Sequence, residues 1–172
     1  AHMLDLLRVH APRSGPAARA GATACTYLLP TVFAAFVERH PAVALYLQEL
    51  TTDESLEALR RGEIDLALIG RGLTRRDQNA SLDGLESERW LIERLLLVGP
   101  PGKGDLPFLT FRRGASTRAL FERAFPDALV AMELGSIAAI KAHVAEGIGR
   151  ALISEHAVSD ELERGDFVQL ED

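Results

Sequence analysis

The feature that most constrains the fold of this chain is an alternation of short apolar runs with amphipathic segments of helical length. A small-residue run at 18–22 precedes a segment, 28–37, in which apolar side chains recur every three to four residues. Residues 43–47 alternate apolar with polar, and residues 64–69 are almost continuously apolar. This order of strand, helix, strand, helix and strand is typical of an α/β fold with a parallel sheet.

Pro30 sets the start of the first predicted helix. Proline breaks a helix interior but is tolerated in a first turn, so we expect the regular helix to begin at position 28 or 29. It is expected to end at His40, directly before Pro41. Residues 23–27 are then predicted to form a loop or distorted turn between the first strand and this helix.

Cap residues mark both ends of the second predicted helix. Thr51 is followed by Glu54 at the capping-box spacing, and Thr52 is the alternative N-cap. Gly62 stands where a C-cap glycine is expected. The second helix is therefore predicted between these residues, directly before the buried strand at 64–69.

The same pattern begins again in the second half of the chain. The polar stretch 71–88 is predicted as a long loop, 95–98 as a buried strand, and the breaker cluster 99–102 as a boundary between two lobes. Beyond it we predict a strand at 108–111, a helix at 116–125, a strand at 129–134, a helix at 136–146, a strand at 150–154, a short helix at 154–162 and a strand at 167–170. Two lobes of the same α/β architecture are therefore expected.

Charge and cysteine content exclude several classes of function. The 25 acidic and 19 basic side chains give a net charge of −6, the wrong sign for a surface that grips DNA phosphates. Cys25 is the only cysteine, so neither a disulfide nor a thiolate metal cluster can form within the chain, and a reducing, cytoplasmic location is expected. No apolar stretch approaches the roughly 20 residues of a membrane-spanning helix, so no membrane association is predicted.

Motifs for catalysis, cofactors and metals are missing from the sequence. It contains no phosphate-binding Gly-Lys-Ser/Thr loop, no HExxH and no strand-linked GxGxxG, and Gly147-Ile148-Gly149 lacks the third glycine. The histidines lie singly, without metal-ligand spacing. Ser154-Glu155-His156 are adjacent, whereas a catalytic triad is seldom made from neighbours. Cys25 is interpreted as a small buried side chain rather than a nucleophile, so we predict no enzyme, no cofactor and no metal.

Hydroxyl side chains recur at the start of helices that follow strands. The set comprises the segment 23–26 with Thr23, then Thr51, Thr52, Ser116, Thr117 and Ser136. Each of them fits an ordinary helix N-cap. Helix N-termini after parallel strands also lie at the carboxyl edge of the sheet, where open α/β folds bind ligands and the helix dipole favours anions. In a two-lobed protein several such termini converge on one cleft, so the set as a whole predicts a site for a small anionic ligand.

Two arginines are candidates for adding positive charge to this site. Arg71 follows the buried strand, and Arg118 lies in the first turn of its predicted helix. The guanidinium fork suits a carboxylate ligand. The alternative for both residues is a solvated surface arginine, and the dipole of its own helix slightly disfavours Arg118.

Several short motifs, none of them specific alone, follow one another in a particular order and spacing. They are Ala20-Gly21-Ala22-Thr23 through Tyr27-Leu28-Leu29-Pro30, Phe36 with His40-Pro41, the segment 59–68, Leu96-Leu97-Val98-Gly99-Pro100, Gly114-Ala115-Ser116-Thr117-Arg118, Glu133-Leu134-Gly135-Ser136 and the segment 144–154. Taken together, they resemble the effector-binding domain of LysR-type transcriptional regulators. The resemblance spans about residues 17–172.

The resemblance implies a two-lobed α/β fold of the periplasmic-binding-protein-like (type II) kind, with two crossing strands and an effector in the cleft. It implies that 17–98 with 155–172 form lobe I and that 99–154 form lobe II. Residues 1–16 would combine a vector remnant, Ala1-His2-Met3, with the stub of a linker helix. A winged helix-turn-helix domain that binds DNA would precede this stub. Pairing through the first helix and a strand of lobe I would give a homodimer, and a tetramer in the full-length protein.

The resemblance also implies positions for the effector contacts. These fall at or beside Thr23, Thr52, Arg71, Ser116, Thr117 and Ser136. Two departures from the family pattern matter. Arg150 stands where the family usually has an aliphatic residue, which indicates an exposed or ion-paired position, and the single cysteine argues against the thiol–disulfide switch of peroxide-sensing members.

The sequence therefore predicts a domain that binds a small anionic metabolite between two lobes and thereby modulates DNA binding and transcription by the full-length protein. Two alternatives stay open. One is a secreted solute-binding protein of a transporter, which shares the fold. The other is an enzyme on the same scaffold, such as a dehydratase or a transferase.

Overall fold

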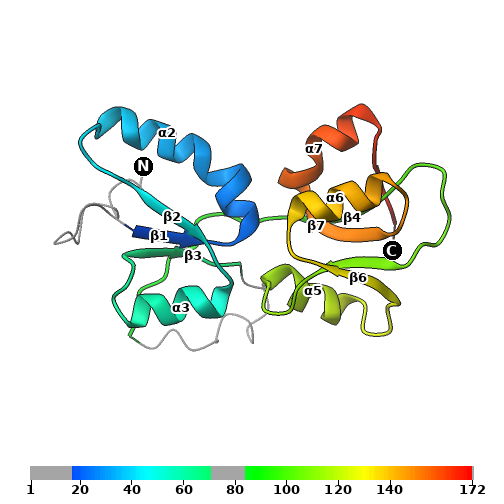
Figure 1. The fold of residues 1–172 in the computed structure, drawn as a ribbon, viewed down its shortest axis with the longest axis horizontal. Helices are drawn as coiled ribbons and strands as arrows, with labels where there is room; N and C mark the ends of the chain where they lie inside the picture. Colours follow the sequence, from blue (N-terminus) through cyan, green and yellow to red (C-terminus); the bar gives the residue numbers. More distant parts are fainter. Residues whose placement is uncertain (1–16, 71–83, 172) are drawn as a thin grey trace. The chain divides into compact units, whose positions relative to one another are not determined.

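A computed structural model of the chain describes residues 17–70 and 84–171. The chain forms two compact units, residues 1–88 and 89–172 (Figure 1). Most of the predicted long loop, residues 71–83, lies outside the described residues. The assignment of 17–98 with 155–172 to one lobe and of 99–154 to the other stays a prediction.

The first unit contains a three-stranded parallel sheet with a helix on each face. Its elements are β1 (Ala17–Ala20), the π-helical turn η1 (Ala24–Leu28), α2 (Leu29–Arg39), β2 (Tyr46–Glu49), α3 (Thr52–Arg60) and β3 (Leu66–Leu68). The strand order is β2-β1-β3, so the chain crosses over the central strand β1 between β2 and β3. Figure 1 shows α2 and α3 on opposite faces of this sheet, as expected for strands covered on both sides.

The second unit contains a five-stranded mixed sheet. Its elements are β4 (Leu95–Gly99), β5 (Phe108–Phe111), α5 (Ser116–Ala124), β6 (Val130–Leu134), α6 (Ile137–Ala145), β7 (Arg150–Ser154), α7 (Glu155–Arg164) and β8 (Val168–Gln169). The order is β6-β5-β7-β4-β8, with β5, β6 and β7 parallel and β4 antiparallel to both β7 and β8. The three parallel strands thus repeat the order of the first unit, with the first strand between the second and the third.

The two units differ in the side chains that form their buried cores. In the first unit the central strand β1 buries only small residues, Ala18 and Ala20, while α2 buries Leu29 and Phe36 seven residues apart on one helix face. In the second unit aromatic rings form the core: the ring centroid of Phe108 lies 5.0 Å from that of Phe121 and 4.9 Å from that of Phe125.

The segment before α2 is helical rather than a loop. Residues 22–23 are already α-helical, residues 24–28 form the π-helical turn η1, and the α-helix α2 begins at Leu29, where Pro30 predicted regular helix to start. Because proline has no N–H to donate, the regular hydrogen-bond ladder cannot run through Pro30, and just before it the N–H of Leu29 donates to the Ala24 carbonyl five residues back. The predicted distorted turn is therefore correct, and the alternative of a loop is wrong.

Strand β2 is displaced by a few residues from its predicted position. The pairing of β2 with β1 begins at Tyr46, opposite Ala17, rather than at Val43. Val43 and Leu45 are still half-buried between exposed neighbours, so the predicted alternation is present just before the paired residues. The other predicted helices and strands begin and end within two residues of the observed bounds.

Candidate ligand-binding site

The hydroxyls predicted in the first half of the chain lie at one edge of the first sheet. The parallel strands β1 and β2 end at Ala20 and Glu49, and the N–H of Leu50 donates to the Ala20 carbonyl over 3.1 Å. Thr23 and Thr52 each follow one of these strand ends by three residues, and both are half-buried. The two chain segments that carry these residues therefore start side by side at the carboxyl edge of the sheet.

Thr51 rather than Thr52 is the N-cap of α3. The Thr51 hydroxyl accepts a hydrogen bond from the N–H of Glu54 at 3.4 Å, and the Glu54 carboxylate accepts one from the N–H of Thr51 at 2.8 Å. This completes the predicted capping box, in which each side chain satisfies a backbone donor of the other residue. Gly62 follows the helix end with a left-handed φ of +66°, as expected of a C-cap glycine. Thr52 lies in the first turn and does not cap the helix.

Thr23 has a different local role from the capping threonine. It precedes η1 with right-handed helical backbone angles, φ −61° and ψ −47°, and its side chain makes no cap hydrogen bond. An N-cap residue normally has an extended backbone that turns its side chain back over the first turn. The interpretation of Thr23 as an ordinary N-cap is therefore wrong, and its hydroxyl is not engaged in capping.

Cys25 lies in η1 at the same edge. Its thiol donates to the Ala20 carbonyl over 3.4 Å. Burial raises the pKa of this thiol, the Glu49 carboxylate raises it further, and the hydrogen bond to the Ala20 carbonyl lowers it in part. A thiol with a raised pKa stays protonated at neutral pH, which favours the interpretation of Cys25 as a packed side chain and not as a nucleophile.

The hydroxyls of the second half lie at the matching edge of the second sheet. Ser136 follows β6 and caps α6: its backbone is extended, and its hydroxyl accepts a hydrogen bond from the N–H of Ala139 at 3.1 Å. By contrast, α5 follows Ala115, which has no side-chain acceptor. Ser116 and Thr117 lie half-buried in the first turn of α5. The N-terminal N–H groups of α5 therefore receive no side-chain cap.

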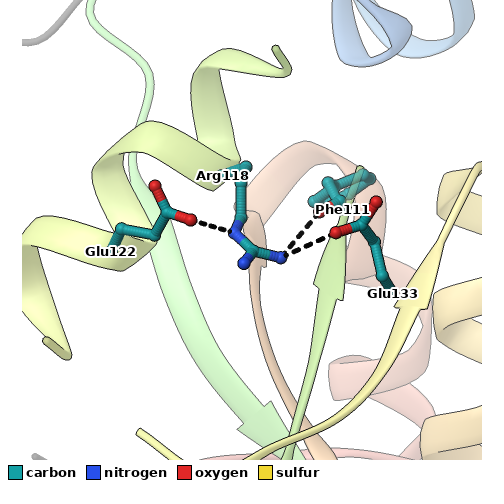
Figure 2. A network of polar contacts seen from close by, with 4 residues as sticks. All are labelled: Phe111, Arg118, Glu122 and Glu133. Carbon is teal, nitrogen blue, oxygen red and sulfur yellow. Dashed lines mark hydrogen bonds and ion pairs between the residues drawn. The ribbon is translucent and has the colours of Figure 1, made fainter. Parts of the chain in front are cut away.

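Arg118 is held inside the second unit. Its side chain is 11% exposed, and Figure 2 shows it extending from α5 between Glu122 on the same helix and Phe111 and Glu133 on two strands. Nε lies 2.7 Å from the Glu122 carboxylate, and Nη1 lies 3.3 Å from both the Glu133 carboxylate and the Phe111 carbonyl. The interpretation of Arg118 as a solvated surface arginine is therefore wrong. The positive charge of Arg118 is also balanced by the carboxylates of Glu122 and Glu133, so it is not an unpaired charge that would bind a ligand.

Two arginines that the sequence pattern did not single out lie beside this edge. Arg112 and Arg113 are exposed in the connection from β5 to α5, where Gly114 makes the turn with a φ of +89°. Their position directly after a strand is the same signal that selected Arg71, which itself lies outside the described residues. Their charges favour an anion at this end of the sheet.

Arg150 is ion-paired, which is one of the two environments, exposed or ion-paired, that the sequence indicated for it. Its guanidinium lies 2.7 Å from the Asp105 carboxylate and stacks 4.4 Å from the centroid of the Phe108 ring. Arg150 begins β7, so it lies at the end of the parallel strands opposite to the helix N-termini. This arginine therefore belongs to the structural support of the sheet and not to the candidate site.

The adjacent triad-type residues form a helix cap. The hydroxyl of Ser154 accepts a hydrogen bond from the backbone N–H of His156 at 3.2 Å, and Glu155 pairs with Arg94 at 3.3 Å.

Across residues 17–70 and 84–171, no group of three or more His, Cys, Asp or Glu side chains is placed to hold a metal ion. In the same part of the chain, no helix has the length and apolarity to cross a membrane.

Comparison with known proteins gives a family match over most of the chain. The model of the LysR substrate binding domain matches residues 19–172. Over 162 residues the chain is 30% identical to the phosphonates import ATP-binding protein PhnC of Anaeromyxobacter dehalogenans, covering 85% of this chain and 32% of that protein. Over 166 residues it is 28% identical to a probable RuBisCO transcriptional regulator of Trieres chinensis, covering 84% of this chain and 52% of that protein. The chain thus spans between a third and about half of these relatives.

A solved structure gives the same assignment of the fold. The regulatory domain of CcmR from Synechocystis PCC6803, in complex with 2-PG, matches with a TM-score of 0.71 at 22% identity, over 92% of this chain and 80% of that one. The predicted α/β fold of the type II periplasmic-binding-protein-like kind is confirmed by this likeness. The resemblance inferred from the ordered motifs is confirmed as well.

Proposed function

Because the chain belongs to the family of LysR substrate binding domains, the effector-binding regulatory domains of transcription regulators, we propose that its ligand is a small anionic metabolite held between two lobes. The proposed lobes are 17–98 with 155–172 and 99–154. Ligand binding would favour one arrangement of the lobes and so change how a longer regulator binds DNA through an N-terminal helix-turn-helix domain. No bond is made or broken in this mechanism, so we propose no catalytic role.

The observation that carries this proposal is the repeated strand order. In each unit the helices that follow the first and second parallel strands begin at the carboxyl edge of the sheet. Hydroxyl residues lie at every one of these four helix starts: Thr23, Thr52, Ser116 with Thr117, and Ser136. Backbone N–H groups and the positive ends of helix dipoles at this edge favour an anion. Arg112 and Arg113 add positive charge beside α5, and Arg71 stays a predicted contact.

We also infer that two copies of this chain pair through the first unit. Among the described residues β2 is an edge strand, and Tyr46 on it is 54% exposed and Leu47 37% exposed, while Val37 on α2 is 47% exposed. Exposed apolar side chains next to an unpaired strand edge favour association with another protein surface. A homodimer here fits a tetramer of the full-length regulator, acting on DNA in the cytoplasm. Sedimentation of the wild type and of Leu47→Lys tests this, since the lysine should shift the population to monomer.

The ligand site is tested by thermal-shift screening of a metabolite library with the intact chain. A ligand that binds only the folded state raises the unfolding temperature by mass action. For the ligand found, the double variant Thr23→Ala with Ser116→Ala should weaken affinity at least about tenfold, as expected when hydrogen bonds to a charged group are lost.

The matched control is Thr31→Ala with Ser159→Ala, which removes two exposed helix hydroxyls away from the predicted contacts. It should leave the affinity unchanged. Equal affinities for the wild type and the Thr23/Ser116 double variant would contradict the proposed site.

A further inference from the structure

Arg118 connects the two chain segments that carry the predicted ligand contacts of the second unit. It directly follows Thr117 in the first turn of α5. Its partner Glu133 lies in β6, three residues before Ser136. Its other partner on a strand is the carbonyl of Phe111, the last residue of β5. One guanidinium therefore joins the start of α5 to the carboxyl ends of both strands at this edge (Figure 2).

The charges around Arg118 explain why it can be buried in this place. A cation in the first turn of a helix is opposed by the helix dipole. The carboxylates of Glu122, at 2.7 Å, and Glu133, at 3.3 Å, offset this and compensate the lost hydration of a side chain that is only 11% exposed. The guanidinium also lies 5.9 Å from the centroid of the buried Phe121 ring. Its geometry is thus determined by contacts on several sides.

The two carboxylates differ in what they hold. Glu122 lies one turn away on α5 itself, so its bond to Arg118 orients the guanidinium within the helix. Glu133 lies on β6, so its bond to Arg118 links the helix to the sheet. Only the second contact restrains where the uncapped N-terminus of α5 lies relative to β6.

We propose that Arg118 is a positioning residue for the ligand site. Through Glu133 and the Phe111 carbonyl it holds the first turn of α5 in the orientation that presents Ser116 and Thr117 to the ligand. This role rests on the proposed function, because it concerns the same edge of the second sheet. A planar fork with several donors suits this task, whereas a lysine offers one ammonium group on a flexible stem.

The test compares Glu133→Gln with Glu122→Gln in the intact chain, with inorganic phosphate as the probe. Each substitution removes one carboxylate charge from Arg118, so a purely electrostatic effect would strengthen phosphate binding in both variants. Amide chemical shifts of Ser116, Thr117 and Ser136 give the affinity at this edge. We expect Glu133→Gln to weaken phosphate binding about fivefold, and Glu122→Gln to leave it unchanged or tighter.

Arg118→Lys separates charge from geometry. It keeps the positive charge but not the fork, so we expect it to weaken phosphate binding as Glu133→Gln does. A purely structural arginine would lower the unfolding temperature without changing the affinity of the folded protein, measured well below that temperature. Equal changes of affinity in Glu133→Gln and Glu122→Gln, or full affinity in Arg118→Lys, would overturn the proposal.

Hydrogen exchange of the ligand-free protein decides the same point without any ligand. The hydrogen-bonded backbone amides of α5, from Ala119 onward, should exchange faster in Glu133→Gln than in Glu122→Gln. If the wild type shows no phosphate-induced shifts at this edge, the proposed anion site fails, but the exchange comparison still tests Arg118. Equal exchange in the two variants would overturn the positioning role even if phosphate binds.

Discussion

The two units share one strand order, and in both of them the hydroxyls at the helix starts fall into the same two groups, those that cap a helix and those that do not. After the second parallel strand, Thr51 caps α3 in the first unit and Ser136 caps α6 in the second. After the first parallel strand, neither Thr23 nor Ser116 makes a side-chain cap. The same topology therefore separates hydroxyls that cap a helix from hydroxyls that make no cap hydrogen bond. A single unit would not have shown that this separation recurs.

The cores of the two units differ more than their topologies. The first unit buries alanines on its central strand and leaves every residue of β2 exposed. The second unit buries Phe108, Phe121 and Leu97 in one cluster and extends its parallel strands by β4 and β8. The second unit therefore has more large apolar side chains at its centre, whereas the first has an edge strand, β2, whose residues are all exposed.

The largest expected effect comes from removing a core ring in either unit. Phe36 is 2% exposed and Phe121 is 3% exposed. Phe36→Ala and Phe121→Ala should each lower the free energy of unfolding by about 3–5 kcal/mol. Phe121→Ala should lie at the upper end, because its ring contacts both Phe108 and Phe125, whereas the Phe36 ring contacts only His40 among the described ring pairs.

Chemical denaturation of both variants measures this and sharpens the comparison. Two transitions, each moved by only one variant, would show that the units unfold separately. Leu129→Ala is the control, because Leu129 is 76% exposed, and it should change stability by less than about 0.5 kcal/mol. An equal and small effect of both phenylalanine substitutions would mean that the aromatic cluster does not distinguish the units.

An intermediate effect is expected at the caps. Thr51→Ala and Ser136→Ala should each lower the free energy of unfolding by about 1 kcal/mol, since each leaves a helix N–H without its acceptor. Thr23→Ala and Ser116→Ala should each change it by less than about 0.5 kcal/mol. Thermal unfolding of the four single variants measures the difference. A cost for Thr23→Ala as large as that for Thr51→Ala would break the division between capping and non-capping hydroxyls.

The smallest expected effect is a pH dependence confined to the first unit. Burial, with the Glu49 carboxylate, raises the pKa of the Cys25 thiol, so the folded state holds this proton more tightly than the unfolded state. The resulting stabilisation is complete below the unfolded pKa and is lost as the pH rises through the folded value. As the pH rises into the alkaline range, the free energy of unfolding of Cys25→Ala should therefore decrease less steeply than that of the wild type.

The rate of reaction with a thiol reagent as a function of pH measures the same property directly. Its midpoint should lie above that of a free cysteine in an unstructured peptide. Because Cys25 is the only cysteine, the reaction reports on the first unit alone. A midpoint at or below the value of the free thiol would contradict the expected burial of Cys25.

Contacts between near neighbours in the chain could be predicted from the sequence. The capping box of Thr51 with Glu54 spans three residues, and the start of α2 follows from Pro30 alone. The alternation of apolar runs likewise predicted the order of helices and strands and the repeat of the α/β pattern. These features depend on local backbone chemistry, so a single sequence contains the information they need.

The start of β2 could not be predicted in the same way. The alternation from Val43 onward describes which side chains are covered, whereas the first paired residue, Tyr46, depends on where β1 begins its own pairing. Register between strands is a property of two segments, and one segment's pattern does not determine it.

The helix-start hydroxyls with which the sequence predicted a ligand site remain its strongest candidates, and the sequence by itself determined their number, type and position after strands. Only the tertiary structure decided which of them cap their helices and where Arg118 points. Arg118 donates to the Phe111 carbonyl and to the Glu133 carboxylate, and these two residues lie 7 and 15 positions away along the chain. Such contacts form only when strands and helix are packed together, because a buried guanidinium needs nearby acceptors to compensate its lost hydration, and the sequence pattern contains no record of burial.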